Sequence, residues 1–374
     1  KPVILSMSLG GRCDFTTRAA ACRENSTEAL AIQELRAQKV MLPGTALAEE
    51  GKLWVTYPGG EGPGKGKHIV LVSGDEEYRS EESMPQMGKI LSKHFGFKCT
   101  VLFAQNPKTG EIDPDNQNNI PGLEALKTAD LMFIVTRFRN LPDEQMQHID
   151  AYLKTGKPVV GMRPATHAFK IPGDRKFHKY SFNSGVEGWE GGFGRQIFGE
   201  TWAGHHVGNK RGYIRGIVAD GAKDHPIVRG LEPGEIGGKT GVYRVTLPMK
   251  PEATPIVLGG ALQGLDFDKP LMEGEKNNPM MPVAWTHTYE AEPGKKGRAF
   301  VTTMGASQDL LVPGFRQMMV QGTFWALGMS DQIPVEGLKV DLVGEFKPNP
   351  YAFSRGGNKA YKAGLKPSDY EMKP

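Results

Sequence analysis

The chain has 374 residues with a mean hydropathy of −0.41, long enough for one large domain or two ordinary ones without help from disulfides. Its 46 basic and 42 acidic residues give a net charge of +4 without a dense Lys/Arg run, which argues against a nucleic-acid binder. No stretch approaches the roughly eighteen consecutive apolar residues of a membrane span. We therefore expect a loop-rich globular protein.

The first part of the chain, residues 1–51, is predicted to be an N-terminal extension. Only residues 27–41 have helical composition. The sequence starts at Lys1, which fits a processed N-terminus and hence a periplasmic or secreted protein, although a shortened chain and a cytoplasmic location remain alternatives. Cys13 and Cys22 are close enough in sequence to pair in an oxidising compartment, and the sequence leaves that pairing open.

The next part of the chain alternates strand and helix patterns. Short apolar runs predict strands at 68–73, 98–104, 131–136 and 159–162. Helical periodicity lies between them, in segments within 84–94, 123–128 and 142–153. This alternation predicts an α/β fold with a doubly wound, mostly parallel sheet and helices on both faces.

Beyond Phe169 the pattern is looser. We expect helices at 193–203 and 314–328, and strands at 213–218, 242–247, 255–258, 283–288 and 298–303. The Pro-, Gly- and Lys-rich end predicts an extended arm packed on the domain, a candidate for contacts in a homo-oligomer. The expected organisation is an extension at 1–51, an α/β domain at 52–330 and a C-terminal tail at 331–374.

Polar side chains follow several predicted strands at the point where each strand ends. Because the carboxyl ends of parallel strands meet at one edge of a sheet, we expect these side chains to converge there. They are Asp75, Glu76, Arg79, Arg137, Arg163, Thr166, His167 and Ser307. A solvated loop or a helix cap explains any one of them alone, and their convergence favours a ligand site.

Three further histidines are candidates for the same site. His205 and His206 follow the predicted helix at 193–203, and His287 lies in a predicted strand. A metal held by His167, His205 and His206 is an alternative, but the sequence lacks recognised ligand spacing such as HExxH or CxxC, so we predict no cofactor. Phosphate-loop and GxSxG patterns are also absent, which disfavours nucleotide binding and serine hydrolysis.

Six segments, taken in order, resemble the ThuA-like (trehalose utilisation) family, in its long form found in planctomycetes. They are GKHIVLVSGDEEYRSEE, DLMFIVTRFRNLPDEQMQHIDAYLKTGKPVVGMRPATHAF, KDHPIVRGL, PVAWTHTY, GRAFVTTMGAS and FRQMMVQGTFWALG. The resemblance covers residues 52–374. It implies a flavodoxin-like fold of the class I glutamine amidotransferase-like superfamily.

The resemblance also bears on the chemistry. The amidotransferases carry a nucleophilic cysteine at the elbow where this chain has Arg163, so we predict that it is not a glutamine amidotransferase. Many family members carry a Gly-His after the late strand, and this chain has Gly305-Ala306 instead, which weakens a metal proposal. The family's Gly-His after the short helix is matched by Gly204-His205.

The family's association with disaccharide catabolism implies a carbohydrate ligand. The leading hypothesis is a hydrolase or lyase acting on a disaccharide or a 3-keto sugar, with Glu76, His167 and His205 as proton-transfer groups. The substrate would be bound by Asp75, Arg79, Arg137, Arg163, Thr166, His206, His287 and Ser307. The alternative is a non-catalytic sugar-binding or assembly protein that has lost the amidotransferase nucleophile.

Overall fold

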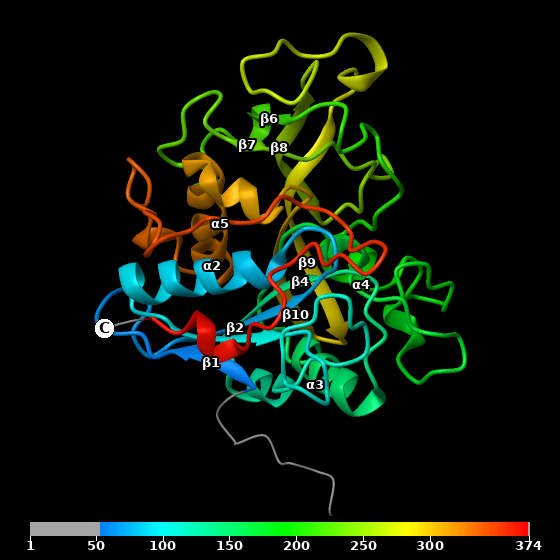
Figure 1. The fold of residues 1–374 in the computed structure, drawn as a ribbon. Helices are drawn as coiled ribbons and strands as arrows, with labels where there is room; N and C mark the ends of the chain where they lie inside the picture. The colour runs from blue at the N-terminus through cyan, green and yellow to red at the C-terminus, as the bar shows by residue number, and fades with distance from the viewer. Residues whose placement is uncertain (1–52, 373–374) are drawn as a thin grey trace, which may run out of the picture. The chain divides into compact units, whose positions relative to one another are not determined.

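The computed structural model describes residues 53–372 (Figure 1). The expectations for residues 1–51, including the helical segment 27–41 and the pairing of Cys13 with Cys22, lie outside the described residues. Among the described residues, no helix is both long enough and apolar enough to cross a membrane.

The described residues form an α/β fold around one mixed sheet of ten strands, in the order β1-β3-β2-β4-β5-β10-β9-β8-β6-β7. Its strands are β1 (Trp54–Tyr57), β2 (His68–Gly74), β3 (Lys98–Phe103), β4 (Leu131–Thr136), β5 (Val159–Gly161), β6 (Ile214–Val218), β7 (Gly237–Gly238), β8 (Ala253–Ala261), β9 (Met281–Glu292) and β10 (Lys295–Thr302). The block β3-β2-β4-β5-β10 is parallel. All other pairings in the described sheet are antiparallel.

The antiparallel half is more extensive than the sequence pattern predicts. The β9 strand ends at Glu292 and β10 begins at Lys295, with Gly294 in the left-handed region at φ 77°. A connection this short can only join antiparallel strands, because a parallel crossover needs a dozen or more residues. Residues 199–312, between α4 and α5, contain no α-helix and supply the antiparallel strands β6 to β9.

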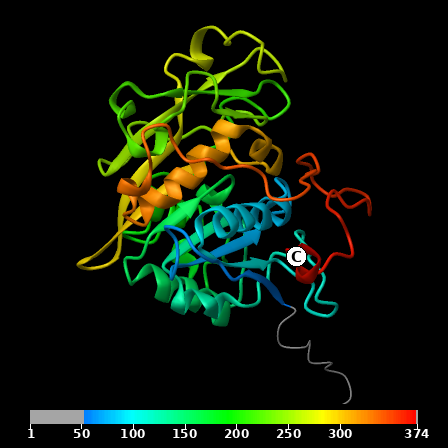
Figure 2. The same cartoon turned by 90° about the vertical axis from the view of Figure 1, so that its left-hand side faces the viewer.

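The helices lie on both faces of the sheet. Their bounds are α2 (Ser80–Phe95), α3 (Asp143–Leu153), α4 (Gly192–Phe198) and α5 (Pro313–Ala326). Figure 2 shows α2 and α5 side by side over one face, where Phe95 and Phe324 meet edge to face at 5.2 Å. A side chain at Gly322 would lie 2.2 Å from the Phe300 ring, so this glycine lets α5 pack closely on β10.

Two predicted elements differ from the structure. The helix predicted at 193–203 ends at Phe198 because Gly199 adopts a left-handed conformation (φ 85°). The segment 242–247 is no strand, and only Tyr243 forms an isolated bridge, with His205. Arg244 N–H donates to the Gly204 carbonyl at 2.8 Å, which ties this segment to the loop that carries His205.

The parallel block forms the centre of the core. Every residue of β2 and β4 is buried, as is typical of strands covered on both faces. This burial explains why these strands appear in the sequence as continuous apolar runs rather than alternating ones.

The C-terminal arm, drawn in red in Figure 1, contacts the loop after β2 and the start of α2. Asn349 N–H donates to the Glu82 carboxylate at 3.1 Å, and Ala352 N–H donates to the Glu77 carbonyl at 2.9 Å. The arm therefore runs over the strand ends where the site residues lie.

Candidate functional site

The loops that follow β2, β4, β5 and β10 meet at one edge of the sheet. Backbone hydrogen bonds join them directly: Arg137 N–H donates to the Gly74 carbonyl (2.9 Å), and Arg163 N–H donates to that of Met304 (3.0 Å). Ser307 N–H also donates to the Tyr78 carbonyl at 2.9 Å. The structure thus brings the predicted strand-end residues together, because parallel strands present their carboxyl ends on the same side.

Asp75 shapes the first of these loops. Its carboxylate is fully buried and accepts hydrogen bonds from the backbone N–H groups of Glu77 (2.8 Å) and Ser80 (2.9 Å). It therefore caps the start of α2 and fixes the loop, which leaves little of it to contact a ligand. Arg79 closes the loop in the left-handed region (φ 65°) and donates to the Glu76 carbonyl at 2.7 Å.

Glu76 is held between two arginines. One carboxylate oxygen pairs with Arg137 and the other with Arg139, whose side chain is fully buried. Arg139 also donates to the carbonyls of Pro114 (3.0 Å) and Asn116 (2.8 Å). With both oxygens occupied by charged donors, Glu76 is well suited to hold the loops together and poorly placed to exchange a proton.

Glu77 has weaker partners than Glu76. It accepts a hydrogen bond from the Asn209 amide at 3.2 Å and lies 3.4 Å from Arg137 Nε. Burial raises the pKa of Glu77, although Arg137 and Arg163 act in the opposite direction. A carboxyl group whose pKa is raised toward neutrality is suited to general acid–base work.

Arg163 lies at the end of β5, 1% exposed, and stacks on two tyrosines. Its guanidinium carbon is 3.6 Å from the ring centroid of Tyr243 and 5.0 Å from that of Tyr78. Nη1 donates to the Thr240 hydroxyl and to the Gly241 carbonyl (2.8 Å). These contacts fix the guanidinium in the middle of the site.

A polar network connects the loops. The Tyr243 hydroxyl donates to the Tyr78 hydroxyl at 2.9 Å, and the Asn209 amide donates to the same Tyr78 oxygen at 3.1 Å. The Asn209 carbonyl oxygen accepts from Gly241 N–H at 3.2 Å. Asn209 therefore links Glu77 to the tyrosine pair and fixes the relative positions of three loops.

The two histidines of the site differ in exposure. His167 is buried, 4.9 Å from the rings of both Phe138 and Trp202, and burial lowers its pKa well below the usual value, helped by Arg137 and Arg163. His205 is exposed and lies 5.1 Å from the Tyr243 ring. Partial desolvation and the same two arginines lower the pKa of His205 to about 4. Both rings are therefore neutral at pH 7.

Aromatic rings border this polar group. Phe138 lies 4.8 Å from Phe182 and 6.1 Å from Trp202, ring to ring. From the C-terminal arm, Phe353, 38% exposed, lies 5.0 Å from the Arg137 guanidinium carbon. Aromatic faces next to a few fixed polar groups are typical of small-molecule sites.

Other predicted site residues lie elsewhere or are occupied. His206 Nε2 faces the Lys276 carbonyl at 3.2 Å. The buried His287 lies on β9 opposite Ala299 of β10, level with Val159 at the start of β5, and its Nδ1 meets the Ile197 carbonyl at 2.9 Å. Thr166 accepts through its backbone carbonyl from the Thr201 hydroxyl, and the Ser307 hydroxyl contacts the Asn349 carbonyl at 3.4 Å. The structure does not bring His206 and His287 to the central group.

Some residues of this group carry no signal in the sequence. They are Trp202, Asn209 and Tyr243, which lie outside the helices and strands, and Asp309, which lies in a short 3-10 helix (Ser307–Leu311). Asp309 is fully buried and accepts from the N–H groups of Lys239 (2.6 Å) and Gly305 (2.8 Å). Asn209, Tyr243 and Asp309 each make a contact that spans at least 70 residues of chain, so no local pattern could reveal it.

A metal centre would need a different set of side chains. Within residues 53–372 no group of three or more His, Cys, Asp or Glu side chains is arranged to hold a metal ion. His206 faces Lys276 instead of completing a group with His167 and His205.

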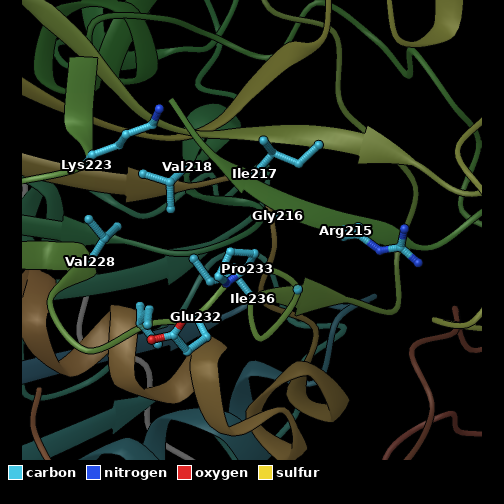
Figure 3. Close-up of a pocket in the computed structure, with 11 residues that line it drawn as sticks. Arg215, Gly216, Ile217, Val218, Lys223, Val228, Glu232, Pro233 and Ile236 are labelled. Carbon is cyan, nitrogen blue, oxygen red and sulfur yellow. The ribbon is translucent and has the colours of Figure 1, made fainter. Parts of the chain in front are cut away.

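An apolar cavity of about 660 Å³ lies apart from this site, in the antiparallel half of the sheet (Figure 3). Val218 of β6 lines it together with Val228, Leu231 and Ile236. None of the strand-end residues described above lines this cavity, and its wall holds no histidine.

Comparisons with known proteins place the chain in a family. The family model described as trehalose utilisation, ThuA, matches residues 69–326, which is more than half of the chain. The search of curated proteins found no match to this chain.

Among solved structures, a putative ThuA-like protein from Parabacteroides merdae is similar, with 14% identity and a TM-score of 0.42, covering 70% of this chain and 90% of that one. The N-terminal domain of mmIFT52 has 10% identity and a TM-score of 0.34, covering 67% and 96%. The exo-β-1,4-mannosidase Op5Man5 from an Opitutaceae bacterium has 9% identity and a TM-score of 0.32, covering 69% and 35%. On the match to the family model, this chain belongs to the ThuA family, described as trehalose utilisation.

Proposed function

We propose that this ThuA-family chain binds a carbohydrate at the carboxyl edge of its parallel strands and acts on it as a hydrolase or lyase. The substrate class would be a disaccharide or its 3-keto form. Family membership supports the link to trehalose utilisation. Counted along the chain, the parallel strands lie in the order second, first, third, fourth, fifth, which favours a flavodoxin-like fold with its ligand at this edge.

The observation that carries the proposal is the combination of two proton-transfer groups with aromatic faces. Glu77 has a pKa raised by burial, and His205 is exposed and neutral. The network of Asn209, Tyr78 and Tyr243 connects the segments that carry them. Trp202 and Phe353 provide apolar faces against which a sugar ring can pack. Glu77 then replaces Glu76 as the proposed carboxyl group.

Two other residues of the predicted set have supporting roles in this proposal. Glu76 holds Arg137 in place through its ion pair. His167, neutral and buried, packs against Trp202 and so orients one aromatic face. Neither exchanges a proton with the substrate.

The second candidate is a non-catalytic sugar-binding protein. The observation that favours it is the arginine at the strand-end elbow, since Arg163 offers no nucleophile. Binding without turnover would be its signature.

The test is product analysis after incubating the full chain with a panel of disaccharides and their 3-keto forms. We expect product from the wild type, and roughly a hundredfold slower turnover in Glu77→Gln and His205→Ala. The matched control is His94→Ala. His94 is exposed and lies in the last turn of α2, at the end away from the site loop, so turnover by this variant should equal that of the wild type. Wild-type rates in both site variants would overturn these assignments, and binding without product would favour the second candidate.

A further inference from the structure

One edge of the Arg163 guanidinium has no partner. Nη1 is used by Thr240 and Gly241, but Nε and Nη2 are buried and form no hydrogen bond with any described residue. The rings of Tyr243 and Tyr78 lie close to the group, with their centroids 3.6 Å and 5.0 Å from its guanidinium carbon. The unused Nε–Nη2 edge is the fork that receives both oxygens of a carboxylate.

The charge of Arg163 also lacks a close counter-ion. Within residues 53–372, no carboxylate oxygen lies within 4.0 Å of its guanidinium nitrogens. By contrast, Arg137 and Arg139 share Glu76, and Arg79 lies 3.5 Å from Glu81. A buried charge is unfavourable unless it is paired, so an anion supplied by a ligand would complete this site.

The neighbouring carboxyl groups are already engaged. Asp309 accepts from two backbone N–H groups, and burial raises its pKa to about 6. Glu77 is bound to Asn209 and lies beside Arg137. Burial lowers the pKa of His167 and of His205, and the charges of Arg137 and Arg163 act in the same direction.

We propose that Arg163 binds the carboxylate of a sugar acid through its Nε–Nη2 edge, so that the ligand of this site is a uronic or aldonic acid unit rather than a neutral sugar. This inference rests on the proposed function for the sugar part of the ligand. Because both nitrogens are screened from solvent, a neighbouring side chain must move. The candidate is the half-buried Tyr351. Its ring lies 6.0 Å from that of Tyr78, and its hydroxyl donates one hydrogen bond, to the Asn209 carbonyl.

The test is titration calorimetry of the full chain with D-glucuronate, its neutral amide D-glucuronamide, and D-glucose, alongside lactate as a carboxylate without a sugar ring. We expect glucuronate to bind at least about tenfold more tightly than glucuronamide, because a charge-assisted pair is lost in the amide. This comparison leaves the protein unchanged, so it holds even if variants of Arg163 fail to fold.

Variants then locate the effect. Arg163→Met should remove the preference for glucuronate, and Arg163→Lys should restore only part of it because an ammonium group cannot form the fork. Arg298→Met is the matched control, since that arginine also stacks on an aromatic ring, Trp325, but at the protein surface. Thermal unfolding of each variant checks that it is folded.

The outcomes separate the two proposals. Equal binding of glucuronate and glucuronamide, or an unchanged preference in folded Arg163→Met, would overturn the inference while the carbohydrate function stands. Binding of lactate and glucuronate alike, lost in Arg163→Met, would support the anion site and overturn the carbohydrate function. If none of the four compounds binds, the sugar-acid inference is overturned, and the disaccharide panel decides the proposed function separately.

Discussion

The reactive side chains and the apolar cavity lie in different halves of the sheet. The parallel half ends in a compact group of charged and aromatic side chains, with Arg163 and His167 almost wholly buried. The antiparallel half contains an apolar cavity of about 660 Å³ lined by Ile236 and its neighbours. A cavity alone does not identify a functional site. Parallel strands bring the polar residues at their carboxyl ends to one edge of the sheet, whereas antiparallel strands place their carboxyl ends at opposite edges.

The largest effect is expected at Glu76, which holds the parallel edge together. Glu76→Gln removes the negative charge shared by Arg137 and the fully buried Arg139, so it should lower the free energy of unfolding by about 3–5 kcal/mol. Urea unfolding measures this. Glu77→Gln should cost clearly less, because the partners of Glu77 are the neutral Asn209 amide and Arg137 at 3.4 Å, and Arg137 keeps its ion pair with Glu76. Equal losses in the two variants would contradict the structural role given to Glu76.

A substitution in the antiparallel half should affect stability without affecting function. Ile236 is 2% exposed and lines the apolar cavity, so Ile236→Ala should lower the free energy of unfolding by about 2–4 kcal/mol. Disaccharide binding by the folded protein should stay unchanged. A loss of affinity measured by calorimetry would mean that the two halves are not independent.

The buried histidine should make the parallel edge sensitive to acid. The pKa of His167 is depressed in the folded protein, so the unfolded chain takes up a proton first as the pH falls below about 6.5. The stability contribution of His167 is therefore present above that pH and is lost on acidification, by up to about 2 kcal/mol between pH 6.5 and 5.

His167→Gln provides the comparison for this pH dependence. Unfolding free energies at pH 7 and pH 5 should differ less in the variant than in the wild type. Asp309 works in the opposite sense, since its pKa of about 6 means that its contribution falls as the pH rises through that value. A steeper acid dependence in His167→Gln would refute the assignment of a neutral buried ring.

The smallest effect is expected at the aromatic border. Trp202→Ala removes a ring that packs against His167, and it should weaken disaccharide binding by about 1 kcal/mol, or roughly fivefold. Trp325→Ala, on α5, is the matched control. Equal affinities in the wild type and Trp202→Ala would remove this ring from the site.

The sequence predicted the central strands well because they are buried on both faces. Continuous apolar runs located β2, β4 and β5 to within a residue, and the ends of β4 and β5 pointed to Arg137, Arg163 and His167. Family motifs covering the same segments agree with the match of the family model over residues 69–326.

The rest of the site could not be predicted because long-range contacts create it. Asn209 meets Glu77 across 132 residues of chain, and Tyr243 meets Tyr78 across 165. Asn209 lies outside every predicted element, and the strand predicted around Tyr243 does not form. Residue type alone also misdirected attention to His287, which the antiparallel pairing of β9 with β10 places opposite Ala299, level with the start of β5 and not with its end. Glu76 and Glu77 are adjacent in sequence, and only their partners distinguish them.

The most direct test of the account is hydrogen–deuterium exchange of the full chain with and without a saturating disaccharide or sugar acid. We predict slower exchange in the strand-end loops at 74–79, 137–139, 163–168 and 203–209, and no change at 215–236 around the apolar cavity. Protection confined to 215–236, with the strand-end loops unaffected, would contradict the claim that the parallel edge is the functional site.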